Sequence, residues 1–131
     1  MILSVHTQAQ AHTIMDATKK DTLCLLAYYL LCNNKMHKAE ALYKVLARKF
    51  PEDGQIAMSL AYIYELTSRH EQALEQVNKS MKQAGEEHAP LALLLKARVL
   101  RRLDRPEEAQ RNVERYLRAL DRRRQDAQSA S

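Results

Sequence analysis

The sequence has little of what loops, β-sheets and covalent cross-links require. Its 131 residues include two glycines, three prolines, one phenylalanine and no tryptophan. So few glycines and prolines exclude a loop-rich or β-rich chain. A core without tryptophan must be built from aliphatic residues, alanine, methionine and tyrosine. The abundant residues, Ala, Leu, Lys, Arg, Glu and Gln, are good helix formers, so the composition predicts one all-α domain.

Cysteines and long apolar segments are also scarce. Cys24 and Cys32 lie eight positions apart on one predicted helix, about 12 Å along its axis. They are too distant for a disulfide and fit no zinc or redox spacing, so we expect two small apolar side chains in a reducing compartment. The longest apolar run, residues 23–32, is too short to span a bilayer. Residues 1–6 lack the pattern of a secretory signal, so we expect a soluble protein inside the cell.

Residues that carry chemistry show no catalytic arrangement. Gly54 and Gly85 stand alone, so no glycine-rich phosphate loop is present. The five histidines have no metal-ligand spacing. The acidic pairs at 86–87 and 107–108 fall at predicted helix starts, where the helix dipole favours them. We therefore predict that the chain is not an enzyme and needs neither a metal nor a cofactor.

An alanine recurs in nearly the same frame along the chain, with spacings of 34 and then 36 residues. A second small residue lies twelve positions before each copy. A 34-residue period with a small residue at a constant place is typical of the tetratricopeptide repeat, a helix–turn–helix unit. Small residues at both places let the paired helices cross closely, because larger side chains would push the backbones apart. The recurring pairs are Ala27 with Ala39, Ala61 with Ala73, and Ala97 with Ala109.

Apolar residues follow these alanines at helical spacing, which predicts three helix pairs. We expect a single domain over residues 22–121, a short right-handed superhelix with a concave groove. Its repeats would be 22–52, 53–87 and 88–121. The predicted helices cover residues 22–33, 36–49, 54–67, 70–83, 89–103 and 106–121.

Both ends of the sequence fall outside this pattern. Residues 1–21 are polar and weakly patterned, so we expect an N-terminal arm that is a loose helix or is disordered until a partner binds. Residues 122–131 lack apolar content and are predicted to form a flexible polar tail.

Several residues mark the predicted helix boundaries. Asp53 lies where its carboxylate would favour the start of the third helix. Asp104 is expected to cap the last helix, with Pro106 in the first turn. The two extra residues of the second period fall around Gly85, which predicts a longer turn there, with Pro90 in the first turn of the next helix.

In a tetratricopeptide fold the first helices of successive repeats line the concave face, so their solvent-side residues form a candidate partner-binding groove. Tyr28 and Tyr62 lie 34 positions apart and would stack along the groove wall, offering broad apolar contacts with polar tips. The surface fits an amphipathic helix or an extended segment, with acidic groups near the basic third repeat. Alternatively, these side chains pack against residues 5–18 of the same chain. The predicted groove residues are Cys24, Tyr28, Leu31, Met58, Tyr62, Leu91, Leu94, Arg98 and Arg101, with Gln55 and Glu65 on the same face.

Basic residues concentrate toward the end of the sequence. Residues 96–124 hold eleven Lys or Arg and five Asp or Glu, a surplus larger than the net charge of +5 of the whole chain. Two interpretations stay open: a solvated helix with internal ion pairs, or a docking surface for an acidic protein. We do not expect nucleic acid as a partner, because no aromatic residues interleave with the arginines. The ion-pair interpretation places Glu107, Glu108, Glu114 and Asp121 beside Arg111, Arg115 and Arg118.

Two parts of the repeat region resemble one family. Residues 25–32, followed by 38–42 and 51–53, look like the opening of the small three-repeat chaperones of bacterial type III secretion, the YscY (SctY) type. The closing stretches 90–100 and 104–120 are similar as well. Both ends of the chain depart from the family pattern.

The resemblance implies a non-catalytic chaperone of the bacterial cytoplasm, connected with virulence. It would bind a small secreted export component (SctX-like) as a heterodimer in its groove, keep it soluble, and deliver it to the export gate protein at the inner membrane without entering the membrane. Two alternatives remain: a chaperone of the needle subunit or of the translocators in the same system, and a generic tetratricopeptide scaffold or homodimer unrelated to secretion.

Overall fold

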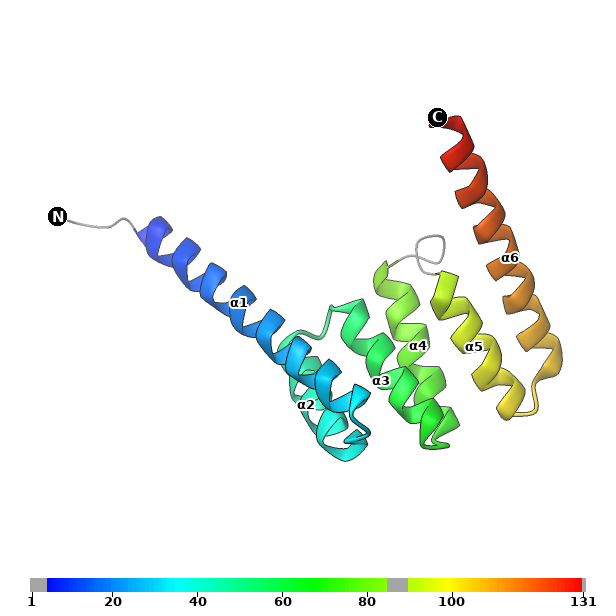
Figure 1. The fold of residues 1–131 in the computed structure, drawn as a ribbon, viewed down its shortest axis with the longest axis horizontal. Coiled ribbons are helices and arrows are strands. Elements are labelled where there is room, and N and C mark those ends of the chain that lie inside the picture. The colour runs from blue at the N-terminus through cyan, green and yellow to red at the C-terminus, as the bar shows by residue number, and fades with distance from the viewer. Residues whose placement is uncertain (1–4, 85–89, 131) are drawn as a thin grey trace. The chain divides into compact units, whose positions relative to one another are not determined.

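A computed structural model describes the backbone of residues 5–84 and 90–130, with the side chains of 16–83 and 90–130. All regular structure in these residues is α-helical, which confirms the all-α prediction. The chain forms two compact units, Met1–Lys49 and Phe50–Ser131, called the first and second units below. The helices (Figure 1) are α1 Val5–Cys32, α2 Met36–Lys49, α3 Gly54–Leu66, α4 His70–Ala84, α5 Pro90–Arg102 and α6 Pro106–Ser129.

The two terminal helices are longer than predicted. Helix α1 begins at Val5 rather than near residue 22, so most of the expected arm is helical. Helix α6 continues to Ser129, so the expected polar tail is helical over 122–129. Neither extension contains glycine or proline, and a helix that has already started gains a hydrogen bond with each added residue. Low apolar content predicted a loose arm and a flexible tail, but it did not indicate where the helices end.

The first unit is one helix pair, in which α1 packs against α2. Ala27 and Ala39, the two recurring alanines of this pair, are both 0% exposed. Tyr43 and Leu46 on α2 are also buried, so the face of α2 that starts at Ala39 lies in the core.

The second unit contains two helix pairs in sequence, α3 with α4 and α5 with α6. Helix α5 also packs against α4, and Figure 1 shows it lying between α4 and α6. The four recurring alanines of this unit are at most 7% exposed. Helix α3 approaches α4 closely at Gly54, where an added Cβ would lie 3.3 Å from the Ser80 carbonyl oxygen. The Ser80 hydroxyl donates a 2.8 Å hydrogen bond to the Gly54 carbonyl.

Each helix pair is joined by the same tight turn. In the third pair, Asp104 has a φ of 59°, and the N–H of Arg105 donates to the carbonyl of Leu100 at 2.9 Å. This left-handed residue with its bond back across the turn is the Schellman motif that ends many helices. The residues with positive φ in the three turns are Asn34, Ser68 and Asp104, and the matching bonds run from Lys35 to Leu30, Arg69 to Tyr64 and Arg105 to Leu100.

The expected boundary residues act as predicted at one helix and differently at another. Asp53 caps α3, where its Oδ1 accepts from the N–H groups of Gln55 at 2.9 Å and Ile56 at 3.2 Å. Asp104, by contrast, closes α5 instead of capping α6, because it occupies the left-handed position of the turn. Helix α6 starts after Arg105, which makes no side-chain cap, with proline in the first turn.

The remaining expectations about the chain's course are settled only in part. Helix α5 begins at Pro90, so this proline lies in the first turn, as predicted. The longer turn predicted around Gly85 lies outside the described residues. Where the structure is described, no helix combines the length and apolar content that crossing a membrane requires.

Candidate functional site

The C-terminal half of α1 exposes a group of large apolar side chains, Leu25, Leu26, Tyr28 and Tyr29, called the α1 patch below. Each of the four is 47–69% exposed. At 100° per residue they form one continuous arc, and the opposite side of the helix carries Ala27, which is buried. The segment is therefore apolar on all sides, while only one side is covered.

The predicted groove residues of the first unit lie on and beside this patch. Tyr28 belongs to the patch, and Cys24 and Leu31 are half-buried at its flank. A hydrogen bond with the Cys32 thiol raises the pKa of Tyr28 above its ordinary value. Cys24 and Cys32 are not joined by a disulfide, as their spacing predicted.

In the second unit, an open groove of about 430 Å³ lies between α5 and α6, called the α5–α6 groove below. It brings together Leu94, Arg98 and Arg101, all three predicted from the sequence as groove residues. Apolar side chains from both helices line it together with these arginines. The other lining residues are Ala97, Pro106, Ala109, Gln110 and Val113.

A second open groove of about 600 Å³ is lined by residues from α3, α4, α5 and α6. It contains Met58 and Leu91, two more of the predicted groove residues, and also Gln55 from the same predicted face. Tyr62 is exposed but lines neither of these grooves. The predicted residues of the second unit are thus divided between two surfaces.

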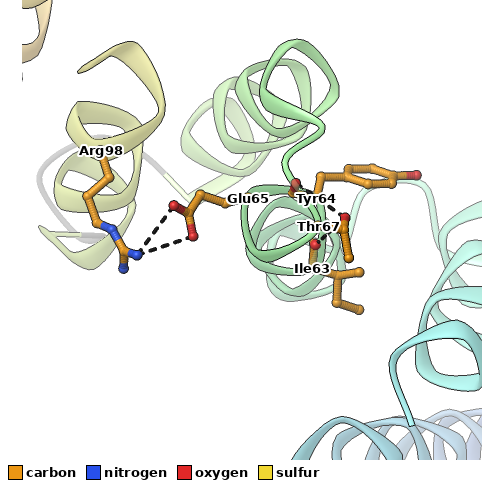
Figure 2. Close-up of polar contacts among 5 residues, drawn as sticks. All are labelled: Ile63, Tyr64, Glu65, Thr67 and Arg98. Atoms are coloured by element: carbon orange, nitrogen blue, oxygen red, sulfur yellow. Dashed lines mark hydrogen bonds and ion pairs between the residues drawn. The ribbon is translucent and has the colours of Figure 1, made fainter. Parts of the chain in front are cut away.

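One expected groove residue, Glu65, is buried instead of facing solvent. Its side chain is 2% exposed and forms an ion pair with Arg98, whose side chain is 54% exposed. Nη2 of Arg98 lies 3.3 Å and 3.2 Å from the two carboxylate oxygens (Figure 2). A buried carboxylate needs such a partner because desolvation disfavours its charge. Arg98 therefore connects α5 to α3, and its positive charge is balanced by the carboxylate of Glu65.

The basic surplus lies in α5 and the following turn more than in α6. Residues 96–105 hold five Lys or Arg and one Asp, whereas 106–129 hold six basic and five acidic residues. Glu108, expected to pair within α6, instead pairs with Arg105 at 2.7 Å. This hydrogen-bonded contact lowers the pKa of Glu108. No ion pair or hydrogen bond of the Arg101 side chain occurs within the described residues.

Within the residues that the structure describes, no cluster of His, Cys, Asp and Glu could hold a metal ion. No protein-family model matches the chain, and no curated protein matches its sequence. The function must therefore be argued from the exposed surfaces themselves.

Sequence reasoning missed two groups of exposed apolar residues. Leu25, Leu26 and Tyr29 were not assigned to a surface, although a segment that is apolar on all sides cannot be covered by one neighbouring helix. On α6, Val113 was likewise not assigned to a surface, yet it is 37% exposed.

Proposed function

We propose that this chain is a non-catalytic chaperone built from tetratricopeptide repeats, which binds a small secreted component of a bacterial type III export apparatus and keeps it soluble. The repeat fold is supported by the 34- and 36-residue spacings, by the burial of all six recurring alanines and by the turn that the helix pairs share. The assignment to secretion rests on the resemblance to the YscY type.

The α1 patch is the single observation that best supports binding of a protein partner. A helix that is apolar on all sides is normally buried on all sides, and contiguous exposed apolar residues on a soluble protein mark an interaction site. Two of the four patch residues are tyrosines, a residue type enriched among the side chains that dominate binding energy. The patch therefore suits a partner with an apolar helix or strand of its own.

The mechanism of such a chaperone is physical. When an apolar helix of the partner lies on the α1 patch, both apolar surfaces leave water, and full burial of one leucine side chain contributes about 1.5–3 kcal/mol. The same contact hides from other molecules a surface of the partner that would otherwise aggregate. The partner is released unchanged, because no covalent step is involved.

Co-expression with candidate partners tests this function. The chain is produced with an SctX-like export component, with the needle subunit or with a translocator, and each mixture is analysed by size-exclusion chromatography and mass measurement. We expect a one-to-one complex with the export component. Retention of the needle subunit or a translocator instead would reassign the partner within the same system. A chain that elutes alone with every candidate would refute the chaperone proposal.

A matched pair of variants tests the surface. Leu25→Glu combined with Tyr28→Glu places charge in the α1 patch, and we expect loss of the partner with unchanged circular dichroism. Val45→Glu is the control, because Val45 is also an exposed apolar residue of the first unit, 54% exposed on α2. The control should keep the partner. Normal co-elution of the partner with the double variant would exclude the α1 patch as its binding site.

A further inference from the structure

The same positions of the second and third helix pairs differ sharply in exposure. Residues 36 positions apart are equivalent, because this spacing relates both recurring alanines and the turns of the two pairs. Val77 and Met81 on α4 are 0% and 4% exposed, whereas their equivalents on α6, Val113 and Leu117, are 37% and 53% exposed. Helix α5 packs against α4, but in the described residues the main packing of α6 is on α5.

The α5–α6 groove repeats the surface that α5 covers in the preceding pair. Its lining residues Ala97, Arg101, Ala109 and Val113 are the equivalents of four buried residues on α3 and α4. Ala97 and Ala109 are buried as well, whereas Arg101 and Val113 are exposed. Since the backbone turns are also the same, another helix could pack on the α5–α6 pair as α5 packs on the α3–α4 pair. This packing surface is called the seat below. The buried equivalents are Ala61, Glu65, Ala73 and Val77.

The charge of this seat is reversed between the two pairs. In the α3–α4 pair the seat includes Glu65, which forms an ion pair with Arg98 of α5. In the α5–α6 pair the equivalent residue is Arg101 on α5. It is exposed and has no ion pair within the described residues. A helix seated in the α5–α6 groove as α5 is seated on the preceding pair would place the equivalent of Arg98 opposite Arg101. A carboxylate is the favoured side chain at that place.

We propose that the α5–α6 groove binds an amphipathic helix of a partner protein, which lies there as α5 lies on the preceding pair and places an acidic side chain opposite Arg101. Apolar residues of that helix, spaced three or four apart, would contact Leu94, Val113 and Leu117. The proposal does not depend on the α1 patch or on the identity of the secreted partner.

A second copy of this chain fits the groove poorly. The first helices of the three pairs carry Tyr28, Tyr62 and Arg98 at the position that would face Arg101. None of these is acidic, and Arg98 would place two guanidinium groups together. The charge pattern therefore favours a different protein with an acidic amphipathic helix.

Two stapled peptides serve as probes of the groove. Both carry the sequence of residues 90–105, since α5 is the helix that occupies the equivalent seat, and a covalent staple holds them helical. One carries Arg98→Glu and the other keeps Arg98 as the matched control. We expect the Glu peptide to bind the full-length chain on the order of tenfold more tightly at low salt, because it pairs with Arg101 instead of repelling it.

A charge swap on the protein completes the experiment. In the Arg101→Glu variant the preference should reverse in favour of the Arg peptide, and Val113→Glu should weaken both. Amide shift changes in the NMR spectrum should centre on Val113 and Leu117. Absence of binding, a preference unaffected by Arg101→Glu, or shifts confined to α1 would overturn the proposal. So would a dimer of the chain alone that Val113→Glu dissociates, which would assign the groove to a second copy.

Discussion

In the α3–α4 pair Val77 and Met81 are buried, whereas their equivalents in the α5–α6 pair, Val113 and Leu117, face solvent. Val77 is fully covered and Val113 is not, although both are valines at the same place in the repeat. In stacked repeats each pair supplies half of an interface and its neighbour supplies the other half. Burial at these positions therefore depends on whether a neighbouring helix covers them, and not on the residue alone.

The same comparison applies to charge. Glu65 is held by Arg98 from the following helix, while Arg101, at the equivalent place, has no ion pair within the described residues. A buried acidic residue, Glu65, and an exposed basic residue, Arg101, thus occupy equivalent positions of the two pairs. Substitutions at equivalent positions should have unequal effects, and the following predictions measure that inequality.

The largest expected difference is between Val77→Asp and Val113→Asp. Burying an unpaired carboxylate at the first position should lower the free energy of unfolding by more than about 3 kcal/mol. At the second position the carboxylate reaches water, and the loss should stay below about 1 kcal/mol. Urea unfolding followed by circular dichroism measures both. Equal losses would mean that Val113 is covered in solution.

Substituting Arg98 or Arg101 with alanine should also have unequal effects on the free energy of unfolding. Arg98→Ala leaves the buried Glu65 carboxylate without its partner and should cost about 1–3 kcal/mol of the free energy of unfolding. Arg101→Ala should change it by less than about 0.5 kcal/mol. Adding Glu65→Gln to Arg98→Ala removes the buried charge and should recover part of the loss. No recovery in urea unfolding would argue against a role for that charge.

The start of α3 should depend on its cap more than the start of α6. Asp53→Ala removes two hydrogen bonds to backbone N–H groups and should cost about 1 kcal/mol. Arg105, the corresponding residue before α6, makes no side-chain cap, so Arg105→Ala should cost less. Thermal unfolding of the two variants compares them directly, and a greater loss for Arg105→Ala would contradict the capping argument.

The turn of the second pair should gain stability from a glycine. Ser68 has a φ of 61°, a conformation that costs an ordinary residue more than glycine. Ser68→Gly should raise the free energy of unfolding by about 0.5–1 kcal/mol. Asp104→Gly should gain less, because aspartate tolerates this conformation better than most residues. The midpoints of thermal unfolding give the order, and no rise in the midpoint for Ser68→Gly would contradict the argument from turn strain.

The smallest effect concerns the exposed pair of the third turn. The hydrogen bond from Arg105 lowers the pKa of Glu108, so its small contribution to stability is present above the pKa of the unfolded carboxyl and is lost as the pH falls through the lower folded value. Arg105→Ala should raise the Glu108 pKa toward its ordinary value. NMR titration of the side-chain carboxyl measures this, and an unchanged titration would exclude Arg105 as the cause.

The interior helices were predictable to within one or two residues, and the terminal ones were not. The 34-residue period and the cap at Asp53 locate α2, α3 and α4 closely, because turns and caps depend on a few adjacent residues. The extensions of α1 and α6 lack any stop signal, so the apolar pattern ended long before the helices did. Asp104 was misassigned for a related reason: aspartate suits both a helix start and a left-handed turn.

The candidate site was predictable as a set of positions but not as a surface. The sequence pointed to Tyr28, Leu94 and Arg101 correctly as residues outside the core, but it placed Glu65 with them. It did not single out Val113, whose spacing from Ala109 equals that of the buried Val77 from Ala73.

The helix pairs, the turn that joins each pair and the small residues at which paired helices cross all follow from the amino-acid sequence. These are properties of short segments: helix propensity, backbone preference in a turn, and side-chain size. Only the tertiary structure decided that Glu65 is buried and Arg101 open, and that Val77 is covered and Val113 exposed. The physical reason is that exposure depends on whether another helix lies against a surface, and the repeat pattern is the same with or without that helix.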